Sequence, residues 1–512
     1  MERKVTFKNI VGYASINFLG SGAQALISAW LMFFYTTVCG ISPAMAGLIF
    51  TLARIVDAVA NPIVGFISDN FGRTKLGRKF GRRKFFILIG APLVTIVFPL
   101  LWVQGKTFTY YLIVNLIFEF IFTIVIVTAI TLPAEMTKKS IERTKLIGAK
   151  QYCGTIASTI ATFIPGVMFA KYGENSPAAF FKIGIIYGVI TGLSLLVVYF
   201  FTFERDPKEI VYNDEIGSIG TIFKKLFMDV ISCMKIKAFR IHSIMMALGS
   251  IYKQLVIGIF TYFAIFVLNM DSIATSNILS FTTLVSSVSL AIFIYLSYKV
   301  GGPKTFRISS YIAFVSIIGY AALIMMNKNG GGNIVLLLTI FALISTVGRA
   351  GIDYIPTYQL PFMSDIDEAV TGQRREGIYT GVNSFFSKIA TAVQGAVLGM
   401  GLAMFGFQSG ATTQPQSAII GIIIVALVFP VVLLGISSIA SLQLKLTKEN
   451  HLILVNEVQR LKEGGRMEDA TQEAKDVFKQ LTGFEYEECW GNNDVVYTDQ
   501  PKVKLNKFLK NS

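Results

Sequence analysis

Long apolar stretches dominate this sequence and leave few folds open to it. Hydrophobic residues make up 53% of the 512 residues and charged residues 15%, whereas soluble proteins carry roughly 25% charged residues. A helix needs about 20 mostly apolar residues to cross a bilayer. About twelve stretches meet this length, at residues 10–38, 43–69, 85–103, 109–132, 148–171, 178–203, 240–268, 273–298, 308–326, 333–356, 377–405 and 417–442. The sequence therefore predicts an all-α membrane protein with twelve transmembrane helices.

The connections between these stretches predict the topology. The basic or long ones lie at 70–84, 133–147, 204–239, 299–307 and 357–376, and the short or Gly-rich ones lie near 39–42, 104–108, 172–177, 269–272, 327–332 and 406–416. Because cytoplasmic loops carry an excess of Lys and Arg, an even number of helices places both termini in the cytoplasm. This pattern also accounts for the net charge of +15, so we expect the lipid bilayer as a partner and no nucleic acid.

The longest internal connection divides the chain into two halves. We expect an N-terminal six-helix bundle at 1–203, a central cytoplasmic loop at 204–239, a C-terminal six-helix bundle at 240–442 and a cytoplasmic tail at 443–512. Two six-helix halves are the layout of major-facilitator transporters, which bind substrate between the halves near mid-membrane. Apolar residues spaced through 452–461 predict an amphipathic helix in the tail, with a regulatory or packing role.

The second apolar stretch contains three polar residues that are costly inside a membrane. Arg54, Asp57 and Asn61 are spaced i, i+3 and i+7, which places them on one face of a helix. A charge in the membrane costs a few kcal/mol or more and marks a cavity, an ion site or a proton relay. Pro62 cannot donate to the carbonyl of Ala58, which leaves another free oxygen nearby. These groups predict a Na⁺ site or a proton carrier at Asp57; the alternative is a self-neutralising Arg54–Asp57 ion pair.

The end of this stretch and the loop after it form a second motif. GFISDNFGR contains Gly65, Asp69, Gly72 and Arg73, and seven Lys or Arg residues lie between Arg73 and Lys84. The motif resembles the loop that major-facilitator proteins place between helices 2 and 3. The glycines permit close helix approach and a tight turn, and Asp69 can cap a helix N-terminus or pair with an Arg. We therefore expect these residues to latch one conformation.

Three stretches resemble the glycoside–pentoside–hexuronide:cation symporter family, the group that includes melibiose permease. RIVDAVANPIVGFISD, at 54–69, is similar to the family's second helix. PAEMTKKSIERT, at 133–144, is similar to its helix 4–5 loop, and TGQRREGIYTGVNSFFSK, at 371–388, is similar to its helix 10–11 loop and the helix that follows. The three lie in the expected order on a twelve-helix frame, so the resemblance covers nearly the whole chain.

The resemblance implies roles for the residues at matching positions. The family's second helix carries two acidic residues that bind the coupling cation; the first matches Asp57 and the second matches Asn61. Lys388 matches the lysine that the family places in helix 11 near the ion and sugar sites. Because an amide carries no formal charge, Asn61 favours H⁺ over Na⁺ as the coupling ion. The helix 10–11 loop is expected to add three residues to the latch: Arg374, Arg375 and Glu376.

Polar residues inside or beside the apolar stretches are the candidates for substrate binding. The family's sugar-binding acidic residues match Ser21 and about Val125, neither of which is acidic, so we expect a pocket different from that of melibiose permease. The candidates are Asn17, Gln24, Arg54, Lys150, Gln151, Lys253, Arg349, Asp353 and Asn383. Arg349 and Asp353 are spaced i and i+4, and a helix-stabilising pair is the alternative interpretation of them. If the charged candidates share one cavity, their basic excess over Asp57, Glu119 and Asp353 favours an anionic sugar.

These observations predict a secondary active transporter that imports a sugar with a coupling cation, H⁺ or Na⁺, by alternating access. The sequence has no GxxxxGK[ST] loop and no catalytic constellation, so we expect neither an ATPase nor another enzyme, and no cofactor. The alternative is a transporter of a lipid or other amphiphilic substrate, which a large apolar groove would favour. We expect a monomer in the plasma membrane, anchored without removal of its first helix.

Overall fold

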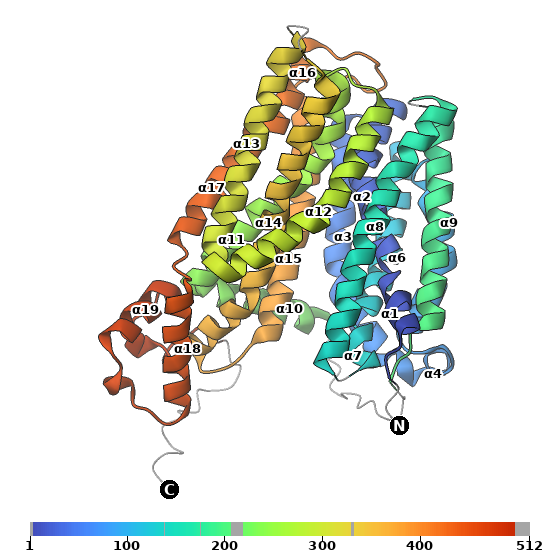
Figure 1. Cartoon of the computed structure of the whole chain (residues 1–512). Coiled ribbons are helices and arrows are strands. Elements are labelled where there is room, and N and C mark those ends of the chain that lie inside the picture. The colour runs from blue at the N-terminus through green and yellow to red at the C-terminus, as the bar shows by residue number, and fades with distance from the viewer. Residues whose placement is uncertain (1–3, 138, 175, 206–218, 329–331, 497–512) are drawn as a thin grey trace.

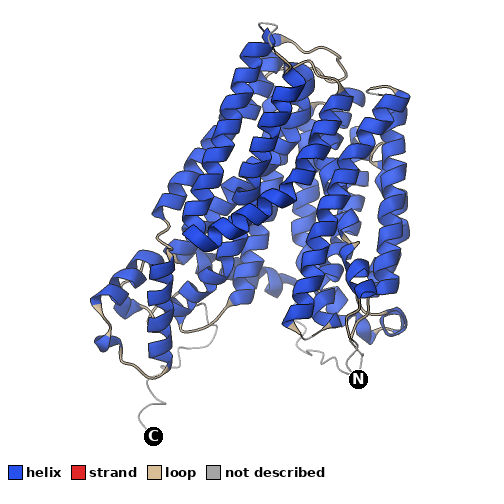
Figure 2. Cartoon of the chain, in the orientation of Figure 1, coloured by secondary structure: helices blue, strands red, loops and turns tan. Residues whose placement is uncertain are grey.

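The computed structural model describes residues 4–137, 139–174, 176–205, 219–328 and 332–496. Over these residues the chain forms helices and short connections, with no strand (Figure 2). The helices of the first half are α1 (Phe7–Ala14), α2 (Gln24–Leu26), α3 (Pro43–Asn70), α4 (Lys75–Phe80), α5 (Lys84–Leu100), α6 (Phe108–Ile130), α7 (Leu132–Met136), α8 (Ser140–Tyr172) and α9 (Pro177–Phe201). Those that follow are α10 (Ile219–Lys235), α11 (Lys237–Tyr262), α12 (Ser272–Val300), α13 (Gly302–Lys328), α14 (Ile334–Thr371), α15 (Glu376–Met404), α16 (Gln416–Ile423), α17 (Phe429–Gln443), α18 (Lys448–Lys462) and α19 (Gln472–Thr482).

The number of spanning helices agrees with the sequence pattern. Eleven helical segments among the described residues are long and apolar enough to cross a membrane. The remaining expected span, the third, is α5, an apolar helix of 17 residues. The predicted all-α membrane fold of two six-helix bundles is therefore confirmed.

The first span, Phe7–Val38, is not a regular helix. Three segments of this span form π-helical turns, which are wider than those of an α-helix. They lie at Phe18–Ala23, between α1 and α2, and at Ile27–Leu31 and Phe34–Val38, after α2. Such turns are uncommon and are frequently found at functional sites. The hydroxyl of Tyr187, on α9, donates to the carbonyl oxygen of Phe18 at 3.0 Å, so this interrupted stretch keeps its backbone satisfied by a neighbouring helix.

The helices form two bundles that lie side by side (Figure 1). In the first, α5 packs on α6 and α9, and α3 packs on α6; in the second, α13 and α12 pack on α14, and α11 packs on α15 and α17. The bundles meet where α3 contacts α15 and where α8 contacts α12. We use the term tail side for the end of the molecule that carries α18 and α19, and far side for the opposite end.

Glycines bring the bundles together on the far side. A Cβ atom added to Gly47 of α3 would lie 2.8 Å from the carbonyl oxygen of Gly395 and 2.9 Å from the Cα of Gly399, both on α15. Only glycine fits such a backbone contact. On the tail side of the same two helices, a Cβ added to Gly65 or Gly381 would meet no described atom within 4 Å. The bundles are therefore in close contact on the far side and separated on the tail side.

The tail folds against the end of the second bundle. Helices α18 and α19 pack on α14, and α19 also packs on α11, through a buried cluster that includes Leu454, Phe478 and Leu481. Beyond α19, the backbone N–H of Trp490 donates to the carbonyl oxygen of Ala369 at 2.9 Å. This contact satisfies one of the carbonyl groups that the end of α14 leaves open. The amphipathic segment predicted from the sequence thus forms a helix of the tail that packs on the second bundle.

The docking of the tail predicts the effect of Phe478→Ala. Phe478 is fully buried, and truncating a buried Phe costs about 3–5 kcal/mol, so the tail should detach more often while the membrane bundles persist. Limited proteolysis of the intact protein should then release the tail faster than in the wild type. Leu452→Ala is the matched control, because Leu452 lies on α18 and is 60% exposed. Equal cleavage of the Phe478→Ala and wild-type proteins would contradict the proposed packing.

Candidate functional site

Arg54 of α3 is paired with residues from two other helices. Its guanidinium donates to a carboxylate oxygen of Glu119, on α6, and to Oε1 of Gln24, on the first span, at 2.6 Å. The side chain of Arg54 is 14% exposed and that of Glu119 is 5% exposed. The position of this charge thus depends on α6, and the self-neutralising Arg54–Asp57 pair that the sequence allowed is not formed.

Asp57 lies on the same face of α3 and pairs across the two bundles. Its Oδ2 accepts from Nζ of Lys388, on α15, at 2.7 Å. Its Oδ1 accepts from the hydroxyl of Thr123, on α6, at 2.5 Å and from the side-chain amide of Asn61 at 2.8 Å. The three residues expected at a coupling site, Asp57, Asn61 and Lys388, are therefore in direct contact. Asn61 acts toward Asp57 as a hydrogen-bond donor.

The four charges together form a neutral group inside the membrane. We name Arg54, Asp57, Glu119 and Lys388 the charge cluster; two are acidic and two are basic. Removing an isolated charge from water costs several kcal/mol, and an opposite charge in hydrogen-bond contact offsets much of that cost. The cluster is stable as a whole, but removing any one member leaves a partner uncompensated.

A cavity of about 470 Å³ lies next to the charge cluster. It is lined from both bundles, and most of the residues that line it have polar side chains. The polar lining residues are Ser21, Gln24, Ser28, Arg54, Ser158, Thr162, Lys253, Gln254, Thr282, Thr283, Ser286, Thr346, Arg349, Asp353 and Thr391. Five of the nine substrate-binding candidates are among them: Gln24, Arg54, Lys253, Arg349 and Asp353.

The charged cavity residues of the second bundle do not form the Arg349–Asp353 pair that their i, i+4 spacing allowed. Asp353 accepts from Nζ of Lys253, on α11, at 2.8 Å. Arg349 donates to the hydroxyl of Thr346 at 2.8 Å, and its Nε is buried without a partner. Within the part of the chain that the structure describes, no carboxylate pairs with Arg349. One guanidinium of the cavity therefore remains available to a ligand.

Four substrate-binding candidates lie outside this cavity's lining. The side-chain amide of Asn17 donates to the carbonyl oxygen of Lys150 at 2.7 Å, so it joins the first span to α8. Gln151 is exposed on α8, and Asn383 is half-buried on α15. The sequence alone could not distinguish these residues from those that line the cavity. A polar residue in an apolar stretch does not reveal which helix its side chain faces.

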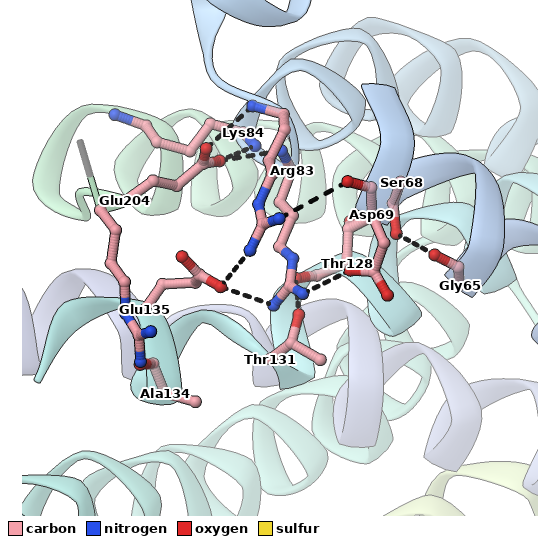
Figure 3. Close-up of polar contacts among 12 residues, drawn as sticks. Gly65, Ser68, Asp69, Arg83, Lys84, Thr128, Thr131, Ala134, Glu135 and Glu204 are labelled. Carbon is pink, nitrogen blue, oxygen red and sulfur yellow. Dashed lines mark hydrogen bonds and ion pairs between the residues drawn. The ribbon is translucent and has the colours of Figure 1, made fainter. Parts of the chain in front are cut away.

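The loop motif forms an ion-pair network at the tail side of the first bundle (Figure 3). Asp69 accepts from Arg83 at 2.6 Å, and Glu135 of α7 accepts from Arg82 at 2.5 Å and lies 3.5 Å from Arg83. The carboxylate of Glu204 accepts the backbone N–H groups of Arg82, Arg83 and Lys84. These contacts tie the end of α3, helix α7 and the residues after α9 to the start of α5.

The glycines of the loop motif have different roles. Gly72 is buried in the turn between α3 and α4. A Cβ on Gly65 would meet no described atom within 4 Å, so Gly65 does not support a close helix contact in this conformation. Arg73 follows Gly72 in the turn, and the partner of Asp69 is Arg83, which immediately precedes α5. The sequence allowed an Asp69–Arg pair but did not identify which Arg.

The helix 10–11 loop forms a matching network in the second bundle. Arg375 donates to both carboxylate oxygens of Asp367, which is fully buried at the end of α14. Arg374 pairs with Glu376 at 2.5 Å and with Asp365 at 3.4 Å. The tail contacts this network, because His451 of α18 lies 2.9 Å from the other oxygen of Asp365. The three predicted latch residues of this loop are thus engaged, and their conformational role stays a prediction.

Sequence reasoning missed several partners in these networks. Glu135 lies within the PAEMTKK stretch, and Glu204 is the first acidic residue after the sixth apolar stretch. An acidic residue at the end of an apolar stretch, next to basic loops, could have indicated an ion-pair partner in both cases. Thr123 carried little signal, because Thr is common in apolar helices. Its spacing of four residues from Glu119 was the only indication that the two share a helix face.

The fold and the site define a class of protein: a membrane transporter with two six-helix bundles and a polar cavity between them. The family model described as MFS/sugar transport protein matches residues 12–448, and the chain belongs to this family. It is 26% identical to an isoprimeverose transporter of Lactiplantibacillus pentosus, over 87% of this chain and 91% of the relative. It is also 26% identical to an uncharacterised symporter of Bacillus subtilis (strain 168), over 85% of this chain and 91% of the relative.

The fold is also similar to that of a solved transporter. The structure of the nucleoside transporter NupG superposes with a TM-score of 0.60 at 14% identity, over 86% of this chain and 100% of that chain. At this identity the likeness shows the fold alone. The sequence relatives support the predicted membership of the glycoside–pentoside–hexuronide symporter group. The name of one of them, a putative glycoside/cation symporter of Escherichia coli (strain K12), places sugar–cation symport within the family.

The charge cluster predicts strong coupling between Asp57 and Lys388. Lys388→Met should cost about 3–5 kcal/mol, because it leaves the carboxylate of Asp57, which is 9% exposed, without its ion-pair partner. Asp57→Asn should cost less, because the side chain of Lys388 is 24% exposed. The double variant should cost less than the sum of the single variants, by about 2 kcal/mol, as expected for a direct contact. Thermal unfolding of the purified proteins in detergent measures the cycle.

A second cycle provides the control for this prediction. Lys253 and Asp353 form an ion pair of similar length, but their side chains are 32% and 53% exposed. Exposed pairs contribute about 0–1 kcal/mol, so the Lys253→Met, Asp353→Asn cycle should show little coupling. Equal coupling in the two cycles would contradict the burial argument.

The ion-pair network at the tail side of the first bundle predicts that two of its acidic residues, Glu135 and Asp69, differ in importance for stability. Glu135→Gln leaves two nearly buried guanidinium groups, Arg82 and Arg83, without their shared carboxylate, so it should cost about 3–5 kcal/mol. Asp69 is 59% exposed, and Asp69→Asn should cost about 0–1 kcal/mol. Unfolding temperatures in one detergent compare them directly; a larger loss for Asp69→Asn would overturn this ranking.

Proposed function

We propose that this protein imports a glycoside, pentoside or hexuronide together with H⁺ by alternating access of its two bundles. The observation that carries the proposal is the charge cluster, which lies beside a polar cavity between the bundles and shares Arg54 with it. One group of residues can thus respond to a cation and to a sugar. Family membership supports the sugar, and the relative named as an isoprimeverose transporter supports a glycoside.

The polarity of the cavity favours a sugar over a lipid. Its lining is rich in hydroxyl, amide and charged groups, which match the hydrogen-bonding groups of a sugar. A lipid chain would require a large apolar surface in the same place. The cavity volume of about 470 Å³ lies within the range of about 300–1,000 Å³ typical of small-molecule sites.

The charges of the cavity favour an anionic sugar. Glu119 balances Arg54, and Asp353 balances Lys253. Arg349 adds one positive charge that no described carboxylate balances. A guanidinium binds a carboxylate through two parallel hydrogen bonds, so a hexuronide fits the charge of the cavity better than a neutral glycoside does.

The contacts of Asp57 favour H⁺ as the coupling ion. A Na⁺ site needs several oxygen ligands, and binding is stronger when two of them are carboxylates. Here Asn61 supplies no charge, and its amide donates to Asp57. Lys388 already occupies the other oxygen of the carboxylate. We propose that Asp57, Asn61 and Lys388 form the core of an H⁺-coupled site.

We further propose the orientation of the protein in the plasma membrane. The basic loops, both ends of the described chain and the docked tail lie on the tail side (Figure 1), and the positive-inside rule assigns that side to the cytoplasm. The bundles are separated on this side, so the conformation corresponds to a cavity facing inward. The protein is proposed to act as a monomer, since each chain contains both bundles.

Uptake into proteoliposomes tests the proposed function. Radiolabelled methyl β-D-glucuronide should accumulate under an inward H⁺ gradient and should accumulate much less under an inward Na⁺ gradient at constant pH. Unlabelled glucuronides should compete more strongly than unlabelled methyl glucosides, because only the former bring a carboxylate to the guanidinium groups that line the cavity. Accumulation driven by Na⁺ alone, or absence of competition by every uronide, would overturn the corresponding part of the proposal.

Asn61→Asp is the matched variant for this test. It restores the second carboxylate one turn from Asp57 and should increase the dependence of uptake on Na⁺. Unchanged cation preference in this variant would show that the identity of residue 61 does not set the coupling ion.

A further inference from the structure

Glu119 occupies an unusual position for a residue that only neutralises its partner. It is 4% exposed in the middle of α6, a helix that is otherwise strongly apolar. One turn later, the hydroxyl of Thr123 contacts Oδ1 of Asp57 at 2.5 Å and the backbone carbonyl of Glu119 at 2.8 Å. Glu119 is thus next to the site at which α3 carries an amide, Asn61, in place of a second acid.

Arg54 separates Glu119 from the cavity. Arg54 lines the cavity and donates to both Glu119 and Gln24, whereas Glu119 does not line the cavity. A ligand in the cavity therefore reaches Arg54 first. An anionic group that binds the guanidinium competes with Glu119 for the same N–H donors, because Arg has a limited set of donors in a fixed plane.

We propose that Glu119 is the second carboxylate of the coupling site and binds the coupling proton when substrate engages Arg54. This inference rests on the proposed H⁺–sugar symport and assigns the proton within it. The second acid that α3 lacks is supplied by α6, one helix away. Asp57 keeps its ion pair with Lys388, and Glu119 alternates between an ion pair with Arg54 and a neutral carboxylic acid.

The proton balance of this step is simple. With the cavity empty, Glu119 is ionised and paired with Arg54. When an anionic substrate takes the guanidinium, a proton from the water on the open side binds a carboxylate oxygen of Glu119, because an unpaired buried carboxylate favours its neutral form. After the bundles reorient and the substrate leaves, Arg54 returns to Glu119 and the proton is released on the other side. No group other than Glu119 changes its charge.

The charges around Glu119 are consistent with this assignment. Arg54 and Asp57 come from α3, and Lys388 comes from α15; Lys253, Arg349 and Asp353 line the adjoining cavity from α11 and α14. Once a substrate anion pairs with Arg54, the substrate, Arg54, Asp57 and Lys388 sum to zero. A charge on Glu119 would then be the single uncompensated charge of the loaded cluster. Its protonation leaves the substrate-loaded charge cluster without an uncompensated charge inside the membrane.

The competing explanation is that Glu119 only neutralises Arg54. Glu119→Gln distinguishes the two roles, because it keeps the size of the side chain and an oxygen for Arg54 but binds no proton. Glu119→Asp keeps the carboxylate. Asn115→Ala is the matched control, because Asn115 is buried one turn earlier on the same face of α6 and donates to Tyr35 at 2.6 Å, outside the charge cluster and the cavity.

The transport test uses radiolabelled methyl β-D-glucuronide in proteoliposomes. For one proton per sugar, an inward gradient of one pH unit supports about a tenfold accumulation. We expect Glu119→Gln to lose this accumulation and the pH dependence of uptake, while counterflow exchange remains within about threefold of the wild type, since exchange needs no net proton movement. Glu119→Asp and Asn115→Ala should retain gradient-driven accumulation. Normal accumulation by Glu119→Gln would overturn the proposal, as would its restoration in an Arg54→Gln, Glu119→Gln double variant.

Infrared difference spectra between neutral and alkaline pH test the proton site without any substrate. In Arg54→Gln protein, Glu119 lacks its partner and should give the stretching band of a protonated carboxyl group at neutral pH. The band should be lost in Arg54→Gln, Glu119→Gln and retained in Arg54→Gln, Asn115→Ala. Absence of the band would overturn the inference even if the wild type transports sugars. A band at Glu119 in a protein that moves no sugar would instead support the proton site and contradict the proposed substrate.

Discussion

The burial of charge inside a membrane is the constraint on which the rest of this structure depends. Arg54, Asp57, Glu119 and Lys388 come from three helices, and each lies against an opposite charge. Singly, each would cost several kcal/mol in a medium of low dielectric constant. Lys388 belongs to the second bundle and the other three to the first, so the cluster is neutral only when the bundles are together. The contacts that make the charges tolerable also join the two halves at mid-membrane.

The chemistry of the cavity follows from this arrangement. Arg54 belongs to the charge cluster and also lines the cavity, so a substrate that binds there changes the balance of the cluster directly. Coupling between a cation and a sugar then needs no long path through the protein. The ion-pair networks at the tail side are separate from this group, and each of them braces one bundle through its own loops.

Much of the fold and part of the site could be predicted from the sequence. Apolar length and loop charge identified twelve spans, and the polar face of α3 identified Arg54, Asp57 and Asn61. The pairing partners could not be predicted, because they depend on which helices lie next to each other. Asp57 pairs with a residue 331 positions later, and Asn17 turned toward the backbone of Lys150. Helix periodicity gives the face of each residue but not its neighbour.

The docked tail has a mechanical consequence. It packs on α11 and α14 and bonds to the last carbonyl groups of α14 through Trp490 and Gly491, so it is a rigid extension of the second bundle. In the proposed alternating-access mechanism, this extension moves through the water on the tail side together with the second bundle. A protein or probe bound to the tail would therefore apply force to the second bundle alone. That force would act at the glycine contact between α3 and α15, where the two bundles meet.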